Sequence, residues 1–205
     1  MNTTVLLATA YLAPVQYYSK LFSYSAVLIE HYEHFPKQTY RNRCNIYGAN
    51  GLLNLSIPLK KRGERMLTKD VKISYDNPWQ KLHWRSLQSA YRRSPFFEFY
   101  EDDFAPFYEN KKFDFLIDFN EALLHLTIQL LGKKTELKNT SLYQKEYANA
   151  DDFRTVISPN KSYTTDTSFI LKPYMQVFDN KYGFIPNLSI VDLLFNQGPS
   201  AVDYI

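Results

Sequence analysis

The sequence contains little of what usually reveals a function. Among its 205 residues only 6 are glycine and one is cysteine, Cys44. A single cysteine cannot form an intramolecular disulfide, and in a strand it is usually a small buried hydrophobe rather than a nucleophile. Since disulfide-free chains are typical of reducing compartments, we expect a cytoplasmic protein.

Common cofactor and hydrolase signatures are also absent. The chain has no Gly-x-Gly-x-x-Gly motif, no Walker phosphate loop and no Gly-x-Ser-x-Gly elbow. We therefore expect no cofactor. No stretch reaches the roughly 20 apolar residues that a membrane-spanning helix needs. Residues 1–8 carry no charged leader, and we read them as the start of a first strand.

Neither sign of charge is in large excess, since the formal net charge is only +3. Such a small excess does not form the basic stripe that general nucleic-acid binding requires, so we expect no nucleic-acid partner. Aromatic residues are abundant instead, with 17 Tyr and 15 Phe. They fill a core first, and tyrosine hydroxyls then serve as anchors at clefts or interfaces. No linker or repeat divides the chain, so we expect one domain over residues 1–205.

Hydrophobic periodicity predicts an α/β fold, a mixed sheet with helices packed on it. The expected elements are a buried strand at 5–11, a helix at 16–30, a hairpin turning at 49–51, a strand at 70–75, helices at 79–94 and 113–131, a short strand at 135–137 and a capped helix within 183–198. Residues 133–173 lack periodicity and are expected to be a variable, loop-rich segment. The chain then ends in an all-helical portion.

Two charged segments admit a functional and a structural interpretation. Glu30 and His34 would share a face of the first helix at a spacing that suits a metal ion, but a third ligand is missing, so we expect no metal. Lys60–Arg65 is a basic segment that is interpreted more simply as a solvated turn than as a phosphate-binding flap.

The segment Arg41-Asn42-Arg43 is the best candidate for an anion site. Each guanidinium group presents paired N–H donors and stays charged at physiological pH, so it can hold a phosphate or carboxylate. Asn42 between them would orient the ligand. The alternative is that both arginines point to solvent at the end of a strand.

His83 and Asp192 are candidates for proton transfer. His83 has the side chain whose unperturbed pKa best suits transfer near neutrality, but flanked by Leu82 and Trp84 it could equally be a core residue. Asp192 follows Ser189 by three residues, a spacing that also fits a helix cap and a first-turn acid. Both alternatives stay open.

Four separated blocks together resemble the WbqC-like proteins of bacteria. Residues 11–18 resemble the family's opening Gln-Pro-x-x-x-Pro-x-x-Gly-Tyr-Phe turn, although Gln16 replaces its glycine and the leading Gln-Pro is not kept. Residues 42–46 with 55–58 are similar to its Asn-Arg-x-x-Ile and Thr-hydrophobic-Pro blocks. Residues 79–97 resemble its central helix and aromatic corner. Residues 174–198 resemble its closing signature, and within 133–173 the sequence Asp151–Arg154 replaces a Tyr-Leu-Ser-Gly-like block.

The resemblance implies a role in the biosynthesis or modification of surface polysaccharides such as O-antigen. From this resemblance we expect a transfer reaction that uses an activated sugar or aminoacyl donor. Transfer of glycine to a sugar is one such reaction. Its rival is a non-catalytic protein that binds a glycan or a partner of the same machinery. We nominate His83 and Asp192 as catalytic residues, and a further set as substrate-binding residues. That set comprises Arg41, Asn42, Arg43, Tyr17, Tyr174, Gln176, Asn187 and Asn196.

Overall fold

The computed structural model describes residues 3–60 and 66–205 and contains two sheets. The strands are β1 (Thr4–Ala8), β2 (Ala26–Glu30), β3 (Arg43–Gly48), β4 (Gly51–Ser56), β5 (Leu137–Asn139) and β6 (Ala150–Asp152). The helices are α1 (Val15–Ser23), α2 (Trp79–Tyr91), α3 (Phe97–Glu109), α4 (Leu116–Leu130), α5 (Asp179–Tyr182) and α6 (Ile190–Gln197), with 3-10 turns at Thr68–Asp70, Tyr163–Thr165 and Gly198–Tyr204. The predicted α/β class and helical C-terminal end are confirmed.

The larger sheet is wholly parallel, in the order β5-β2-β1-β6. Its centre is β1, where Val5, Leu6 and Leu7 are completely buried, as expected for a strand covered on both faces. Because α1 connects β1 to the parallel strand β2, residues 4–30 form a βαβ unit. All four strands therefore present their carboxyl ends at one edge.

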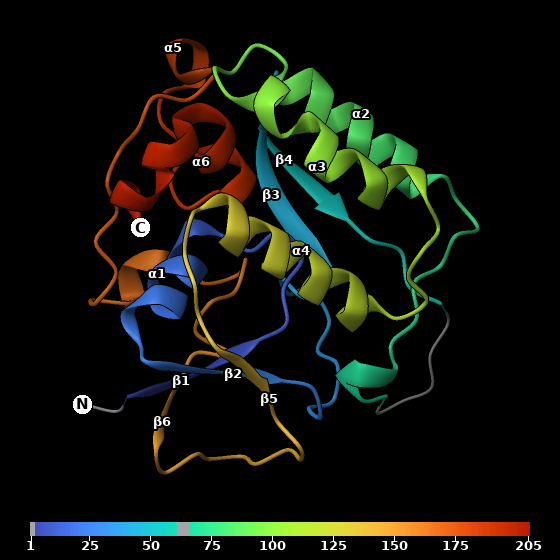
Figure 1. Cartoon of the computed structure of the whole chain (residues 1–205), viewed down its shortest axis with the longest axis vertical. Coiled ribbons are helices and arrows are strands. Elements are labelled where there is room, and N and C mark those ends of the chain that lie inside the picture. Colours follow the sequence, from blue (N-terminus) through green and yellow to red (C-terminus); the bar gives the residue numbers. More distant parts are fainter. Residues whose placement is uncertain (1–2, 61–65) are drawn as a thin grey trace.

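The smaller sheet is the antiparallel hairpin β3–β4, joined at Gly51 with φ of 97°. The predicted turn at residues 49–51 is thus confirmed. In Figure 1 the hairpin lies beside α2 and α3, and α4 crosses the middle of the molecule between the hairpin and the parallel sheet. Helix α6 contacts α1, α3 and β3. The two sheets consequently share one hydrophobic core, in which Val5, Ile46 and Phe195 are buried together.

The helices predicted from long apolar stripes are confirmed. Trp79, His83 and Leu87 lie on the buried face of α2, whose N-cap is Pro78. The Ser189 hydroxyl caps α6 by accepting from the amide of Val191, 3.5 Å away. Gly198 follows α6 with φ of 54°, and a Cβ atom there would lie 2.4 Å from the ring of Phe96. Both the positive φ and the close ring therefore favour glycine.

Two predictions of secondary structure are wrong, and two elements were missed. The helix expected over residues 16–30 ends at Ser23, and residues 26–30 form β2. Because that strand is a continuous apolar run with β-branched Val27 and Ile29, strand pairing overrides the helical spacing. Residues 70–75 make only isolated bridges, including Leu59 with Ile73. Helix α3 and strand β6 were not predicted.

Candidate functional site

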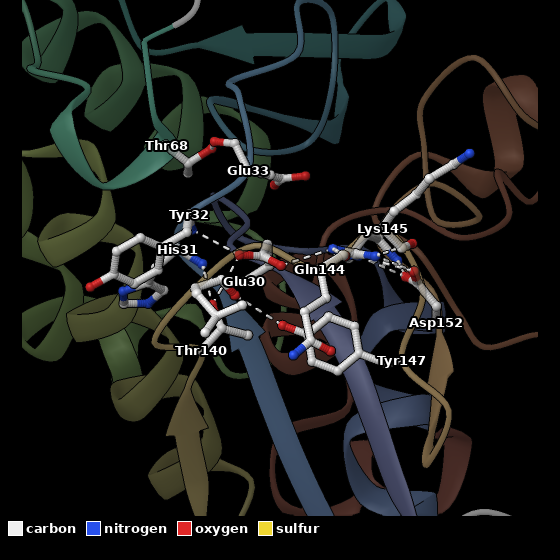
Figure 2. Close-up of polar contacts among 12 residues, drawn as sticks. Glu30, His31, Tyr32, Glu33, Thr68, Thr140, Gln144, Lys145, Tyr147 and Asp152 are labelled. Atoms are coloured by element: carbon white, nitrogen blue, oxygen red, sulfur yellow. Dashed lines mark hydrogen bonds and ion pairs between the residues drawn. The ribbon is translucent and has the colours of Figure 1, made fainter.

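Charged side chains gather where the parallel strands end. Glu30 is the last residue of β2, and Asp152 is the last residue of β6. Ligands of open α/β sheets bind outside the carboxyl ends of the strands, so this edge is the first place to look for a site. Figure 2 shows that Glu30 and Asp152 belong to one network of polar contacts.

Arg154, two residues beyond β6, is the centre of this network. Its Nη1 donates to Glu30 Oε2 at 2.8 Å and to the Gln144 carbonyl at 3.0 Å. Its Nη2 donates to Asp152 Oδ2 at 2.6 Å and to the Lys145 carbonyl at 3.2 Å, while Nε donates to Asp152 at 3.0 Å. All five N–H groups of the guanidinium are thus used, and Arg154 has no donor left for a ligand.

Glu30 is a completely buried carboxylate. Its Oε1 accepts from the Tyr32 amide at 2.8 Å and from the Thr140 hydroxyl at 2.9 Å, and that hydroxyl in turn accepts from the His31 amide at 3.1 Å. Figure 2 shows these groups converging on Glu30. Through Glu30, the ends of β2, β5 and β6 are therefore held together.

A second ion pair joins Arg41 to Glu33. Arg41 Nε donates to Glu33 Oε1 at 2.6 Å, and Nη2 donates to Glu33 Oε2 at 2.8 Å and to the Arg154 carbonyl at 3.3 Å. Arg41 Nη1 forms no hydrogen bond with any described residue. Burial raises the pKa of Glu33, and the neighbouring Arg41 opposes that rise. The pair thus offers a free donor and a carboxylate that takes up a proton more readily than an exposed one.

This ion pair lines a cavity of about 270 Å³, the carboxyl-edge cavity. Its lining also includes Arg154 and the hydroxyl-bearing side chains of Thr39, Tyr143, Thr155 and Ser158. The Tyr143 ring lies 5.2 Å from the Arg154 guanidinium carbon. The cavity therefore combines an acid–base group, a free N–H donor and several hydroxyls, which is the composition of a small polar-ligand site.

Arg43 lies close to this edge along the chain but differs from Arg41. It begins β3 opposite Ser56 and is half-buried. Its Nε atom is buried without a hydrogen-bond partner, and Arg43 forms no ion pair with a described residue. Residues two apart in a chain have Cα atoms at most about 7 Å apart. The Arg43 backbone therefore lies near that of Arg41, and the Arg43 guanidinium has no carboxylate partner among the described residues.

Asn42 and Tyr17 fix the backbone around the two arginines. Asn42 Nδ2 donates to the Ile57 carbonyl at 2.9 Å, and the Ile57 amide donates to the Asn42 carbonyl at 2.8 Å. The buried Tyr17 hydroxyl donates to the Ala8 carbonyl at 3.0 Å, and burial raises the pKa of Tyr17. Both side chains therefore use their polar groups within the protein, at positions that hold the site.

His83 lies elsewhere, in the interior between α2 and α3. Its Nδ1 atom is 3.0 Å from the Tyr11 hydroxyl, which is 2.9 Å from the Tyr108 hydroxyl. Burial lowers the pKa of His83 to about 4, against the effect of a hydrogen bond with the Ser56 backbone. His83 is therefore neutral near pH 7, and its ring lies within a chain of internal hydrogen bonds.

Asp192 forms a third, separate cluster on α6. Its Oδ1 accepts from the Tyr91 hydroxyl at 2.8 Å, and its Oδ2 accepts from the Tyr174 hydroxyl at 2.7 Å and from Gln176 Nε2 at 2.8 Å. Asn196 Nδ2 donates to the Asp192 carbonyl at 2.7 Å. Burial raises the pKa of Asp192 to about 6, although the three side-chain donors oppose that rise. With no exposed surface, this carboxylate holds the C-terminal segment against α2.

Asn187 ties the C-terminal segment to the start of α1. Its Oδ1 accepts from the Gln16 amide at 2.9 Å, and its Nδ2 donates to Gln16 Oε1 at 3.4 Å. Its φ of 52° is a left-handed conformation that asparagine tolerates better than most residues. The residue nominated as substrate-binding is thus also one that fixes a turn.

The structure divides the nominated residues into three places. Arg41, Asn42, Arg43 and Tyr17 lie near the carboxyl edge, His83 lies between α2 and α3, and Tyr174, Gln176, Asn187, Asn196 and Asp192 belong to the C-terminal segment. Sequence reasoning missed Glu33 and Arg154. A signal for Glu33 was present, because Glu30–His34 directly follows the apolar run of residues 26–29.

The metal hypothesis for Glu30 and His34 rested on a shared helix face that does not exist, because Glu30 ends a strand. Over residues 3–60 and 66–205, no group of three or more His, Cys, Asp or Glu side chains is arranged to hold a metal ion. Of the basic segment Lys60–Arg65, residues 61–65 lie outside the described residues. None of the described helices is both long and apolar enough to cross a membrane.

Comparison with known proteins then defines the family. The model of the WbqC-like protein family matches residues 9–170. The chain belongs to this family. The WbqC-like match contains Arg41, Arg43 and His83 and all of the lining of the carboxyl-edge cavity. It includes residues 133–170, which the sequence resemblance left out, and it ends before the segment that holds Asp192.

One curated relative is similar over most of its length. This WbqC-like chain is 27% identical over 197 residues to the uncharacterized protein Rv1507c of Mycobacterium tuberculosis. The alignment covers 83% of each of the two chains. No solved structure matches it significantly. The family membership rests on the match over residues 9–170.

Proposed function

We propose that the protein is a cytoplasmic transferase of surface-polysaccharide biosynthesis or modification. The donor would be an activated sugar or aminoacyl compound that carries an anionic group. One observation carries the proposal. The unpaired Arg43 lies two residues along the chain from Arg41, which lines the carboxyl-edge cavity. A transferase needs to hold a charged donor beside an acceptor whose proton can be removed, and these two elements supply both requirements.

Each residue has a distinct role in this proposal. Arg43 binds the anionic group of the donor, because its guanidinium faces no carboxylate and its Nε is desolvated without a partner. Glu33 is the general base, because burial brings the pKa of its carboxyl closer to neutrality. Arg41 Nη1 orients the ligand, and Asn42 holds the two arginines at a fixed spacing through Ile57.

Donor binding is tested by thermal unfolding with nucleotide sugars and aminoacyl phosphoesters. A ligand at 100 times its dissociation constant stabilises the fold by about 2.7 kcal/mol, which is about 5–10 °C for a chain of this size. We expect that shift with at least one anionic donor, and we expect Arg43→Gln to abolish it. Arg85→Gln removes the same charge from an exposed position of α2 and serves as the control. Equal shifts in both variants would remove Arg43 from the site.

A second candidate function is non-catalytic binding of a glycan or partner. It is favoured by the positions of His83 and Asp192, whose polar groups are engaged inside the protein and lie in two different clusters. Their predicted catalytic roles stay predictions. The two functions differ in turnover, because a binding protein would take up donor and acceptor and return both unchanged.

A further inference from the structure

The charges around the carboxyl-edge cavity limit what it can bind. Both guanidinium groups that line the cavity already contact a carboxylate: Arg41 is paired with Glu33, and Arg154 with Glu30 and Asp152. A phosphate entering the cavity would therefore meet no unpaired guanidinium group. Arg41 Nη1 can still donate, but its charge is already balanced by Glu33, whereas phosphate sites rely on arginine or lysine groups whose charge faces the anion.

The connected network carries one negative charge in excess. Three carboxylates, those of Glu30, Glu33 and Asp152, face two guanidinium groups, those of Arg41 and Arg154. Figure 2 shows the Lys145 side chain extending away from the cluster, so its ammonium group does not offset this excess. A ligand that brings a positive charge is thus favoured over an anionic one.

Glu33 is the carboxylate that such a ligand can reach. Glu30 is completely buried, whereas Glu33 lines the cavity and its side chain is 10% exposed. A carboxylate has about four lone-pair positions, and Arg41 occupies one on each oxygen. The remaining positions can accept from an ammonium group without breaking the ion pair.

Size and hydroxyl groups point to a single sugar ring. The volume of about 270 Å³ lies just below the range of about 300–1,000 Å³ typical of sites for drug-sized ligands, so a whole nucleotide sugar would not fit inside. The hydroxyls of Tyr143, Thr155 and Ser158 form no hydrogen bonds with described residues. Tyr143 is 49% exposed and offers a ring face to a sugar. These groups suit a ligand rich in hydroxyls.

We propose that the carboxyl-edge cavity binds an amino sugar, with its ammonium group on Glu33 and its hydroxyls on the surrounding side chains. This rests on the proposed transferase function and assigns the cavity to the acceptor, whereas the donor's anion is held at Arg43. On transfer of one proton from the ammonium to the Glu33 carboxylate, the acceptor becomes a neutral amine and Glu33 a carboxylic acid. The amine nitrogen is then a nucleophile.

The test is an NMR titration of the wild-type protein with glucosamine, glucose and glucose 1-phosphate at pH 6, where the amine is protonated. We expect glucosamine to bind about tenfold more tightly than glucose, because a charge pair at an effective dielectric constant near 20 supplies more than the 1.4 kcal/mol that tenfold requires. Glucose 1-phosphate should bind most weakly. The amide shifts should centre on residues 33–41 and 155–158.

Glu33→Gln isolates the charge, since glutamine still offers one oxygen to Arg41. The variant should bind glucosamine and glucose within about twofold of each other, with glucose affinity little changed. A wild-type protein that prefers glucose 1-phosphate, binds none of the three sugars, or shows shifts elsewhere would overturn the inference. The wild-type comparison decides the question even if the variant does not fold.

The outcome also separates this inference from the proposed function. If glucosamine fails but an anionic donor still binds through Arg43, the acceptor assignment falls and the transferase proposal stands. If glucosamine binds at Glu33 but no anionic donor stabilises the protein, the transferase proposal falls and the amine site stands.

Discussion

Replacing Arg154 by glutamine removes the cation that faces the Glu30 carboxylate. Glu30 has no exposed surface, and Arg154 Nη1 lies 2.8 Å from its Oε2. The variant leaves a buried carboxylate with only the Tyr32 amide and the Thr140 hydroxyl as donors. Removal of one partner from a buried ion pair costs about 3–5 kcal/mol, because the remaining charge stays desolvated.

Further contacts of Arg154 are lost in the same variant. The guanidinium also holds Asp152 and the carbonyl groups of Gln144 and Lys145, so the segment between β5 and β6 loses its anchor. We therefore expect Arg154→Gln to lower the free energy of unfolding by about 4 kcal/mol and the melting temperature by about 10 °C. Urea denaturation at pH 7 measures the first quantity and thermal unfolding the second.

Two control variants separate the charge effect from a general loss of packing. Arg92 is 69% exposed, and its Nη2 atom is as far as 3.8 Å from Glu101 Oε1. Arg92→Gln should therefore lower the free energy of unfolding by less than about 1 kcal/mol. The double variant Glu30→Gln with Arg154→Gln contains no unpaired buried charge, and it should recover about 2 kcal/mol relative to Arg154→Gln. A single variant as stable as wild type, or a double variant less stable than Arg154→Gln, would refute the reasoning.

Three further substitutions give separate predictions. Burial raises the pKa of Asp192 to about 6, so the wild-type protein loses about 3 kcal/mol of stability as the pH rises from about 4 to 6. Asp192→Asn lacks this titration. Its free energy of unfolding relative to wild type, measured by urea denaturation, should therefore rise over that pH range. Burial lowers the pKa of His83 to about 4, so the wild-type protein loses about 3 kcal/mol of stability as the pH falls from about 6.5 to 4. The stability of His83→Gln relative to wild type should therefore rise as the pH falls over that range. Curves parallel to wild type would contradict either assignment. Glu33→Gln should lower turnover at least about 100-fold while the donor-induced thermal shift persists, and unchanged turnover would exclude Glu33 as the base.

Long elements with a clear apolar stripe were predictable from the sequence. Helix α4 carries buried Leu116, Phe119 and Leu123 at helical spacing, and the spacing alone indicated it. The strand predicted at residues 135–137 overlaps β5 only at Leu137, and β6 was not predicted; each strand has three residues, which is too short for any periodicity. They become strands only because β2 and β1 provide backbone partners from distant parts of the chain.

The candidate site depends on those distant pairings. Glu30 and Arg154 are 124 residues apart in sequence and meet only because β2 and β6 lie in one parallel sheet. The helix predicted over residues 16–30 hid the strand end at Glu30. The segment Arg41–Arg43 was recognised for its chemistry, but no local pattern shows that Arg41 is paired with a carboxylate while Arg43 is not.

Detection of a transfer product tests the central claim most directly. Wild-type protein, an amino sugar and each donor that produced a thermal shift are incubated together, and the mixture is analysed by mass spectrometry. We predict a product whose mass equals the amino sugar plus the transferred group, with the product lost in Arg43→Gln and in Glu33→Gln and retained in Arg85→Gln. No product from wild type although both ligands bind, or equal product from all variants, would contradict a transfer site at the carboxyl edge of the sheet.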